Sequence, residues 1–312
     1  MYDSTKPYKR QILDTIKQTW ETPYVSVRGG ISPIIKKKFS NDMEEISHVD
    51  GTGTKGFYHW QQKTYENAVI DSLAMNLNDL AMDRAVPYAL EDHIFLPEDD
   101  REAITSIIES LKKNCIQRHI AIVGGETAIH NNMDGLDISI TMNGFIKNSK
   151  INQFQPGDYL IGLKSNGLHS NGFTKVREVF KEEFREEFIH PTKIYLETIL
   201  QLDTQIDING MMHITGGAFT KLKDILDNND AIITKDHKLK PHSIFNELYS
   251  RGVCDEDMYK TFNCGIGFIF SVPGVHAYMA IAGLDAAIIG EIVPGNGKVK
   301  IQSMFSNKEV EY

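Results

Sequence analysis

The chain has 312 residues and a formal net charge of −9. This acidic balance argues against a general role in binding nucleic acid or a membrane surface, and no apolar run approaches the roughly eighteen residues that cross a bilayer. The cysteines, at positions 115, 254 and 264, form no C-x-x-C pair, so we expect a cytoplasmic protein without structural disulfides or a zinc–thiolate site.

The first half of the chain alternates helical and strand-like patterns. We expect helices at 8–20, 57–81 and 98–114, and strands at 45–49, 88–95, 120–123 and 138–146. Turn residues at Gln155-Pro156-Gly157-Asp158 then precede a buried-looking strand at 159–163.

The second half continues the alternation. Helices are expected at 173–188, 191–202, 219–226 and 244–251, and strands at 231–233, 265–272 and 286–293. The pattern predicts an α+β protein of two mixed α/β domains, at 1–154 and 155–312.

The segment Asp50-Gly-Thr-Gly-Thr-Lys55 carries the strongest chemical signal, because it joins a carboxylate, a glycine loop and a lysine. The amides of Gly51 and Gly53 are expected to approach phosphate oxygens, Lys55 to neutralise them, and Asp50 to hold a nucleotide's magnesium. No G-x-x-x-x-G-K-[ST] motif occurs, which excludes a P-loop NTPase at the motif level.

A dinucleotide-binding interpretation competes at this segment. Gly51, Gly53 and Gly56 fit G-x-G-x-x-G, and Asp71 lies twenty residues after Gly51. That interpretation needs Asp71 at a strand end, whereas the apolar spacing over 57–81 predicts an unbroken helix. We therefore favour the phosphate and magnesium interpretation.

Further polar blocks recur downstream: Asn78-Asp79, Gly124-Gly-Glu-Thr127, His169-Ser-Asn-Gly172 and His213-Ile-Thr-Gly-Gly217. Glu126 follows two glycines after a short apolar stretch, so we expect a turn that directs it from a strand end toward metal or ribose hydroxyls. His169 has the residue type that moves a proton near neutral pH. A buried structural histidine remains an alternative for His213, which follows two methionines.

Taken in order, these blocks resemble the phosphoribosylformylglycinamidine cyclo-ligase (aminoimidazole ribonucleotide synthetase) family of purine biosynthesis. The glycine and HSNG blocks are shared with a wider superfamily of ATP-using enzymes. Pro191-Thr-Lys-Ile-Tyr195 and Met258-Tyr-Lys-Thr-Phe-Asn-Cys-Gly-Ile-Gly267 are more particular to the cyclo-ligases. The resemblance spans nearly the whole chain.

The resemblance implies ATP-dependent ring closure of formylglycinamidine ribonucleotide to aminoimidazole ribonucleotide. It implies ATP and Mg²⁺, bound by the N-terminal domain at 1–154, and a C-terminal α–β sandwich at 155–312. It leaves a K⁺ requirement open and implies a homodimer in which the N-terminal domains pair strands. The implied catalytic residues are His169, Asp79 and Lys55, and the metal ligands are Asp50 and Asp79. ATP or phosphate would be bound by Gly51, Gly53, Thr54, Lys55, Gly125, Glu126, Thr127, Ser170, Asn171, His213, Thr215, Gly216 and Gly217.

The chain departs from the family pattern at three places. Arg84 replaces a glycine before Ala85, the 129–135 segment replaces a longer loop after GGET, and Arg28-Gly29-Gly30 keeps only part of a glycine-rich loop. These changes put the exact substrate and the efficiency in doubt more than the fold.

Two other interpretations stay open. The first is another ATP-using member of the superfamily that acts on a different small substrate. A selenophosphate synthetase would need a cysteine near the N-terminal glycines, and a hydrogenase-maturation protein would need a C-terminal cysteine. The second is a catalytically inactive scaffold paralogue, which loss of Asp50, Asp79, Glu126 or His169 would mark; all four residues are present.

Overall fold

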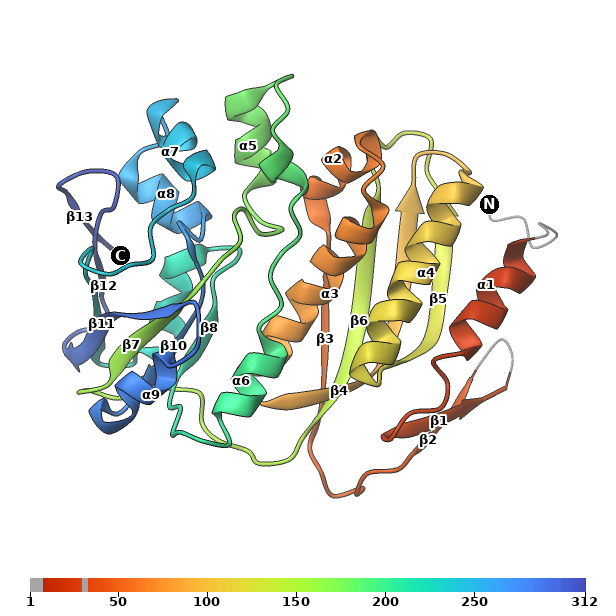
Figure 1. The fold of residues 1–312 in the computed structure, drawn as a ribbon, viewed down its shortest axis with the longest axis horizontal. Helices are drawn as coiled ribbons and strands as arrows, with labels where there is room; N and C mark the ends of the chain where they lie inside the picture. The colour runs from red at the N-terminus through yellow and green to blue at the C-terminus, as the bar shows by residue number, and fades with distance from the viewer. Residues whose placement is uncertain (1–7, 30–32) are drawn as a thin grey trace. The chain divides into compact units, whose positions relative to one another are not determined.

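The computed structural model describes residues 8–29 and 33–312, so Gly30 of the predicted N-terminal glycine loop lies outside the described residues. The chain divides into two compact units (Figure 1): unit 1 comprises residues 1–80 and 84–148, and unit 2 comprises 81–83 and 149–312. Among the described residues, no helix is long and apolar enough to cross a membrane.

Unit 1 is built on a mixed sheet with the strand order β3-β6-β4-β5, in which β4 and β5 are parallel and the other neighbours are antiparallel. These strands are β3 (Glu45–Gly51), β4 (Ala85–Leu96), β5 (Ala121–Ile129) and β6 (Asp137–Ile146). The separate hairpin and the helices are β1 (Val25–Arg28), β2 (Ile34–Lys37), α1 (Tyr8–Lys17), η1 (Gly53–Lys55), α2 (Gly56–Gln61), α3 (Tyr65–Met82) and α4 (Arg101–Arg118).

One face of the unit 1 sheet is covered and the other is partly open. Helices α3 and α4 lie over the covered face (Figure 1), where Ile138, Ile140 and Met142 are fully buried. On the opposite face the β1–β2 hairpin packs against Phe145 and its neighbours, whereas Val49 on β3 remains 62% exposed.

The predicted long helix is interrupted, which corrects the expectation of an unbroken segment at 57–81. Helix α2 ends at Gln61 and α3 begins at Tyr65, and Lys63 between them has a positive φ of 53°. Asp71 lies within α3 and not at a strand end, which argues against the dinucleotide-binding interpretation. Helix α4 begins at Arg101, three residues after the expected start at residue 98, and the Asp100 carboxylate accepts from the amides of Glu102 and Ala103 as its N-cap.

Unit 2 is built on a sheet with the strand order β13-β12-β9-β11-β7-β10-β8. Its strands are β7 (Tyr159–Lys164), β8 (Met211–His213), β9 (Asn229–Ile233), β10 (Ile266–Val272), β11 (Ala286–Pro294), β12 (Val299–Gln302) and β13 (Glu309–Glu311). Its helices are α5 (Phe173–Phe180), η2 (Glu186–Ile189), α6 (Leu196–Leu202), η3 (Ala218–Ile225), α7 (Ser243–Ser250), α8 (Asp255–Thr261), η4 (Gly274–His276) and α9 (Ala277–Ile281).

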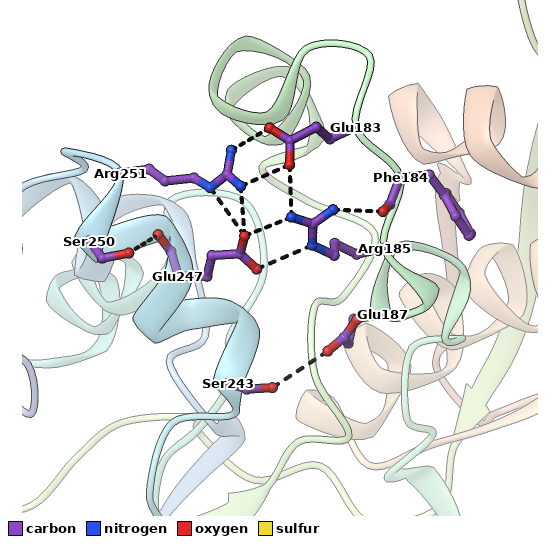
Figure 2. A network of polar contacts seen from close by, with 8 residues as sticks. All are labelled: Glu183, Phe184, Arg185, Glu187, Ser243, Glu247, Ser250 and Arg251. Carbon is purple, nitrogen blue, oxygen red and sulfur yellow. Dashed lines mark hydrogen bonds and ion pairs between the residues drawn. The ribbon is translucent and has the colours of Figure 1, made fainter.

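The predicted helix at 173–188 is also shorter than expected. Helix α5 ends at Phe180, and Lys181 with φ of 53° turns the chain. The segment that follows is held to α7 by a network of two glutamates and two arginines (Figure 2). Arg251 donates to both Glu183 oxygens at 2.8 and 2.9 Å, and Arg185 bridges Glu183 and Glu247.

Candidate active site

The glycine loop after β3 is shaped by close packing as well as by backbone flexibility. A side chain at Gly51 would meet the Ile138 carbonyl at 2.6 Å, and one at Gly56 would meet the Leu136 carbonyl at 1.9 Å. Gly53 has a φ of +60° with open space around it, and its amide donates to the Asp137 carboxylate at 3.1 Å. Gly53 and Thr54 are exposed, so this part of the loop is accessible to a ligand.

Lys55 points into the protein. Its ammonium is fully buried and lies 3.0 and 2.9 Å from the two Asp71 carboxylate oxygens, while His59 Nε2 lies 2.8 Å from Asp71 Oδ2. Burial lowers the pKa of both Lys55 and His59, and Asp71 acts in the opposite direction on each. Lys55, which was predicted to bind phosphate, therefore points into the protein, where its ion pair with Asp71 attaches the loop to α3.

Asp50 and Asp79, the predicted metal ligands, lie on facing elements of unit 1 with His48 beside them. His48 Nε2 is 3.3 Å from Asp79 Oδ2, and His48 Nδ1 is 3.0 Å from Asn76 Oδ1. Asn76 also donates to the Asp50 carbonyl at 3.1 Å, which ties α3 to the end of β3. The hydrogen bond to Asp79 is the main cause that raises the pKa of His48.

The donor set fits a magnesium ion that arrives with a nucleotide. Among the described residues, no group of three or more histidine, cysteine or acidic side chains surrounds one point as a ready metal cage. Magnesium is typically held by one or two carboxylates together with water and substrate phosphates. Asp50 and Asp79 supply hard oxygen donors of that kind.

The Gly124-Gly-Glu-Thr127 block lies inside a strand, which corrects the predicted turn. Strand β5 runs through it, and Gly125 pairs with Asp92 of β4. A side chain at Gly125 would lie 2.7 Å from the Asp92 carboxylate, so glycine is required for close approach. Glu126 is exposed and Thr127 is buried. Burial raises the pKa of Asp92 to about 7.

In unit 2 the His169-Ser-Asn-Gly172 loop leads into α5. Gly172, with φ of +78°, is the residue before the helix, and a side chain there would meet the Phe262 ring at 2.6 Å. The Ser170 amide donates to Thr192 Oγ1 at 3.0 Å. Asn171 donates to the Thr261 carbonyl. The loop is thus held by two of the blocks that are particular to the cyclo-ligases.

His169 and His213 are buried in a cluster of rings. The His169 ring centre lies 5.8 Å from that of His213 and 6.2 Å from that of Tyr195. Tyr195 donates to the Lys164 carbonyl at 3.0 Å. A side chain at Gly267 would approach Tyr195 Oη to 2.1 Å and His169 Cε1 to 2.5 Å, so glycine makes room for both rings.

The His213 block continues from β8 into η3. Thr215 is buried, whereas Gly216 and Gly217 are exposed. Gly217 has a φ of +80° and precedes η3. The exposed glycine backbone is the accessible part of this block.

Several residues at these sites received no role from the sequence. They are His48, Asn76 and Asp137 in unit 1, and Thr192, Lys193, Tyr195 and Asn263 in unit 2. Asn263 connects two loops, because it accepts from Ser165 Oγ at 2.8 Å and donates to the Gly167 carbonyl at 2.8 Å. The four residues of unit 2 belong to sequence blocks that already indicate the family. His48, by contrast, is a lone histidine outside any motif, so the sequence did not indicate a role for it.

Cys264 lies beside this loop and behaves as a buried apolar side chain. It is 3% exposed, and burial raises its thiol pKa well above the usual value. A thiol in that environment is a poor nucleophile. Cys264 is therefore a small core residue.

The fold and these sites define the class of AIR synthase related proteins. The N-terminal domain of that family matches residues 34–146, and its C-terminal domain matches residues 155–302. Among solved structures, hydrogenase maturation protein HypE in complex with ATP has a TM-score of 0.72 at 15% identity, covering 99% of this chain and 95% of that one. Thiamine monophosphate kinase from Aquifex aeolicus has a TM-score of 0.62 at 16% identity, covering 88% and 91%. These two likenesses show the shared fold.

The relatives found by sequence identify the family more narrowly than the solved structures do. The chain is 34% identical to phosphoribosylformylglycinamidine cyclo-ligase of Saccharolobus solfataricus over 278 residues, which cover 86% of this chain and 83% of the relative. It is 32% identical to the cyclo-ligase of Methanothermobacter thermautotrophicus over 315 residues, covering 94% and 91%. The chain belongs to the phosphoribosylformylglycinamidine cyclo-ligase family.

Proposed function

We propose that this protein closes the imidazole ring of 5-aminoimidazole ribonucleotide from formylglycinamidine ribonucleotide, with consumption of ATP, in purine biosynthesis. The observation that carries this proposal is that two sequence blocks typical of the cyclo-ligases pack around His169. Tyr195 of the PTKIY block and Gly267 of the MYKTFNCGIG block shape the space that His169 occupies. Family membership at 34% identity supports the same reaction.

The reaction we propose has two steps. The formamide oxygen of the substrate attacks the γ-phosphorus of ATP and ADP leaves, which converts a poor leaving group into phosphate. The tethered amidine nitrogen then attacks the same carbon, phosphate departs and a proton is lost. Since the nucleophile is already in the substrate, the protein's task is mainly to orient the groups and exclude water.

The nucleotide's phosphates are assigned to the exposed backbone around Gly53 and Thr54 and to the GGET block. Asp50 and Asp79 would hold Mg²⁺, which neutralises phosphate charge when bound. His48 and Asn76 hold these two segments in place through the contacts described above. Lys55 supports the loop from inside.

The substrate-side roles fall to unit 2. We assign movement of the amidine proton to His169, and phosphate contacts to Ser170, Asn171 and the exposed Gly216-Gly217 backbone. Thr215 and His213 support that backbone from the buried side. Peptide amides near the start of a helix and in glycine turns are suited to such anions.

We also propose a homodimer in which the N-terminal domains pair strands. Strand β3 lies at the edge of the unit 1 sheet, and an edge strand can pair with a strand of a second copy. Val49 on this strand is 62% exposed. Sedimentation of the purified protein would report a monomer if this proposal is wrong.

The direct test of function is ATP-dependent formation of aminoimidazole ribonucleotide, measured by diazo coupling of the amine product. We expect robust turnover with Mg²⁺ present. A protein that binds MgATP and gives no product would instead act on a different small substrate. A protein that binds no nucleotide would be an inactive paralogue.

Asp50→Asn separates the metal role of Asp50 from a structural one. The change keeps shape and removes the charge, so we expect a folded protein whose MgATP-dependent turnover falls at least about a hundredfold. Circular dichroism checks the fold, and calorimetry with MgATP checks binding. Undiminished turnover would remove Asp50 from the metal site.

A further inference from the structure

The phosphate contacts assigned to unit 2 are all neutral. They come from Ser170, Asn171 and the backbone of Gly216 and Gly217. A phosphate monoester carries a charge of about −1.5 to −2 at pH 7, and proteins commonly pair such a group with arginine or lysine. Lys193, the lysine of the PTKIY block, stands beside these contacts and is a candidate for the missing positive charge.

Lys193 is half-buried and its ammonium group is held in one place. The ammonium donates to the Lys164 carbonyl at 3.2 Å and lies 5.5 Å from the centre of the Tyr195 ring. The Tyr195 hydroxyl donates to the same carbonyl at 3.0 Å. One carbonyl at the end of β7 therefore joins the lysine ammonium to the tyrosine hydroxyl.

The neighbours of Lys193 in its block attach it to the HSNG loop. Tyr195 packs against His169, with 6.2 Å between the ring centres. Thr192 Oγ1 accepts from the Ser170 amide at 3.0 Å. The backbone that carries Lys193 is thus fixed to this loop from both sides, so the position of the ammonium relative to His169 and Ser170 is set by packing.

The charges around Lys193 favour a bound anion. Burial is the main cause that lowers the pKa of Lys193; the exposed Asp285 acts in the opposite direction, and the neighbouring Lys164 lowers this pKa further. An ammonium group that has lost part of its water near a second ammonium is stabilised by an anion. It also carries three protons, so it can donate to a phosphate oxygen as well as to the Lys164 carbonyl.

We propose that the Lys193 ammonium binds a phosphoryl group of the reactants and is a further catalytic residue of unit 2. Two sources supply this chemistry: the 5′-phosphate of the ribonucleotide substrate, and the phosphoryl group that leaves from the formamide carbon. In both cases lysine acts as a fixed point charge and no bond to it is formed. The inference rests on the proposed function and adds a residue to that site.

The first test compares kcat/KM for formylglycinamidine ribonucleotide in wild-type protein, Lys193→Met and Lys193→Arg. Methionine keeps the length and the contact with Tyr195 and removes the charge, so we expect a loss of about ten- to a hundredfold. Arginine restores the charge and should recover most of that loss. Lys193→Gln serves if the methionine variant does not fold, as judged by its melting temperature.

The matched control is Lys298→Met. Lys298 is an exposed lysine of unit 2 that pairs with Glu311 beside the edge strands β12 and β13, and its loss should leave kcat/KM unchanged. A wild-type protein without turnover would refute the proposed function. Turnover by the wild type with equal kcat/KM in Lys193→Met would refute only the role of Lys193.

The second test separates the two phosphoryl sources by calorimetry without ATP, with the substrate ribonucleotide and its 5′-dephosphorylated ribonucleoside as probes. If Lys193 holds the 5′-phosphate, Lys193→Met weakens the ribonucleotide at least about tenfold and leaves the ribonucleoside unchanged. If it holds the leaving phosphoryl group, both affinities stay unchanged and kcat at saturation falls. Equal weakening of both probes would overturn the proposal, because the side chain would then only support the loop.

Discussion

The two units build their candidate sites in opposite ways. In unit 1 the loop that ends β3 rests on buried charges, with Lys55 and Asp71 both fully buried. In unit 2 the HSNG loop rests on packed rings and on glycines that leave room for them, as at Gly267. Unit 1 should therefore be most sensitive to loss of a charge partner, and unit 2 to small increases in side-chain volume.

The largest expected effect is in unit 1. Lys55→Met leaves the Asp71 carboxylate without its ammonium partner in the interior, and we expect a loss of about 3–5 kcal/mol of unfolding free energy. Trp20 and Trp60 both belong to unit 1, so tryptophan fluorescence during urea unfolding reports the unfolding of unit 1.

Two controls sharpen this prediction. Lys55→Met/Asp71→Leu removes both charges and should recover most of the loss. Lys113→Met breaks an exposed pair with Glu66, whose side chains are 71% and 54% exposed, and should cost less than about 1 kcal/mol. Equal effects of Lys55→Met and Lys113→Met would contradict the buried-charge account.

Asp92 gives unit 1 a specific pH dependence. Its folded pKa, about 7, lies above the ordinary value of 3.8, so the folded state binds more protons and this residue lowers stability as pH rises from about 4 to 7. Asp92→Asn should raise the unfolding free energy at pH 8 by on the order of 2–4 kcal/mol and leave it nearly unchanged below pH 4. Urea titrations at both pH values measure this difference, and a pH-independent difference would rule out titration of Asp92 as its cause.

Gly267→Ala tests the packed rings of unit 2. The added methyl would press on Tyr195 and His169, and we expect a loss of about 1–3 kcal/mol. If His169 acts in the reaction, its displacement should lower turnover by about a hundredfold. Gly216→Ala is the matched control for stability alone, because a side chain there meets open space; a similar loss of unfolding free energy in both variants would show that the crowding at Gly267 is not the cause.

The smallest expected effect concerns the charge network of Figure 2. Glu247→Gln weakens its bonds to Arg185 and Arg251 at the surface of unit 2. We expect a small fall in melting temperature at low ionic strength that disappears in about 1 M salt, because exposed pairs are screened. A fall that persists in high salt would assign this glutamate a packing role.

The sequence predicted the elements of the fold better than their interruptions. The strand ending at Asp50, the helix containing Asp71 and most strands of unit 2 follow from apolar spacing. The breaks at Lys63 and Lys181 were missed because each depends on a non-glycine residue with positive φ. The GGET block was read as a turn, although its glycines serve close approach of Asp92 within a strand.

In the candidate site, the sequence singles out residues that stand in a local motif, namely Asp50, Asp79 and His169, and their roles stay predictions. The inward direction of Lys55 was not predictable, because its partner Asp71 lies sixteen residues away on a helix. His48 and Asn76 were missed for the same reason, since their importance comes from contacts between β3 and α3.

The most direct measurement of the central claim follows the formamide oxygen. Formylglycinamidine ribonucleotide labelled with ¹⁸O at that oxygen is incubated with MgATP and the protein, and in a separate control reaction with MgATP and the Asp50→Asn variant. The products of both reactions are analysed by mass spectrometry. Phosphorylation of this oxygen predicts that the label appears in inorganic phosphate, in step with formation of aminoimidazole ribonucleotide, and that Asp50→Asn transfers almost none. Ring closure with the label released into water would contradict the account.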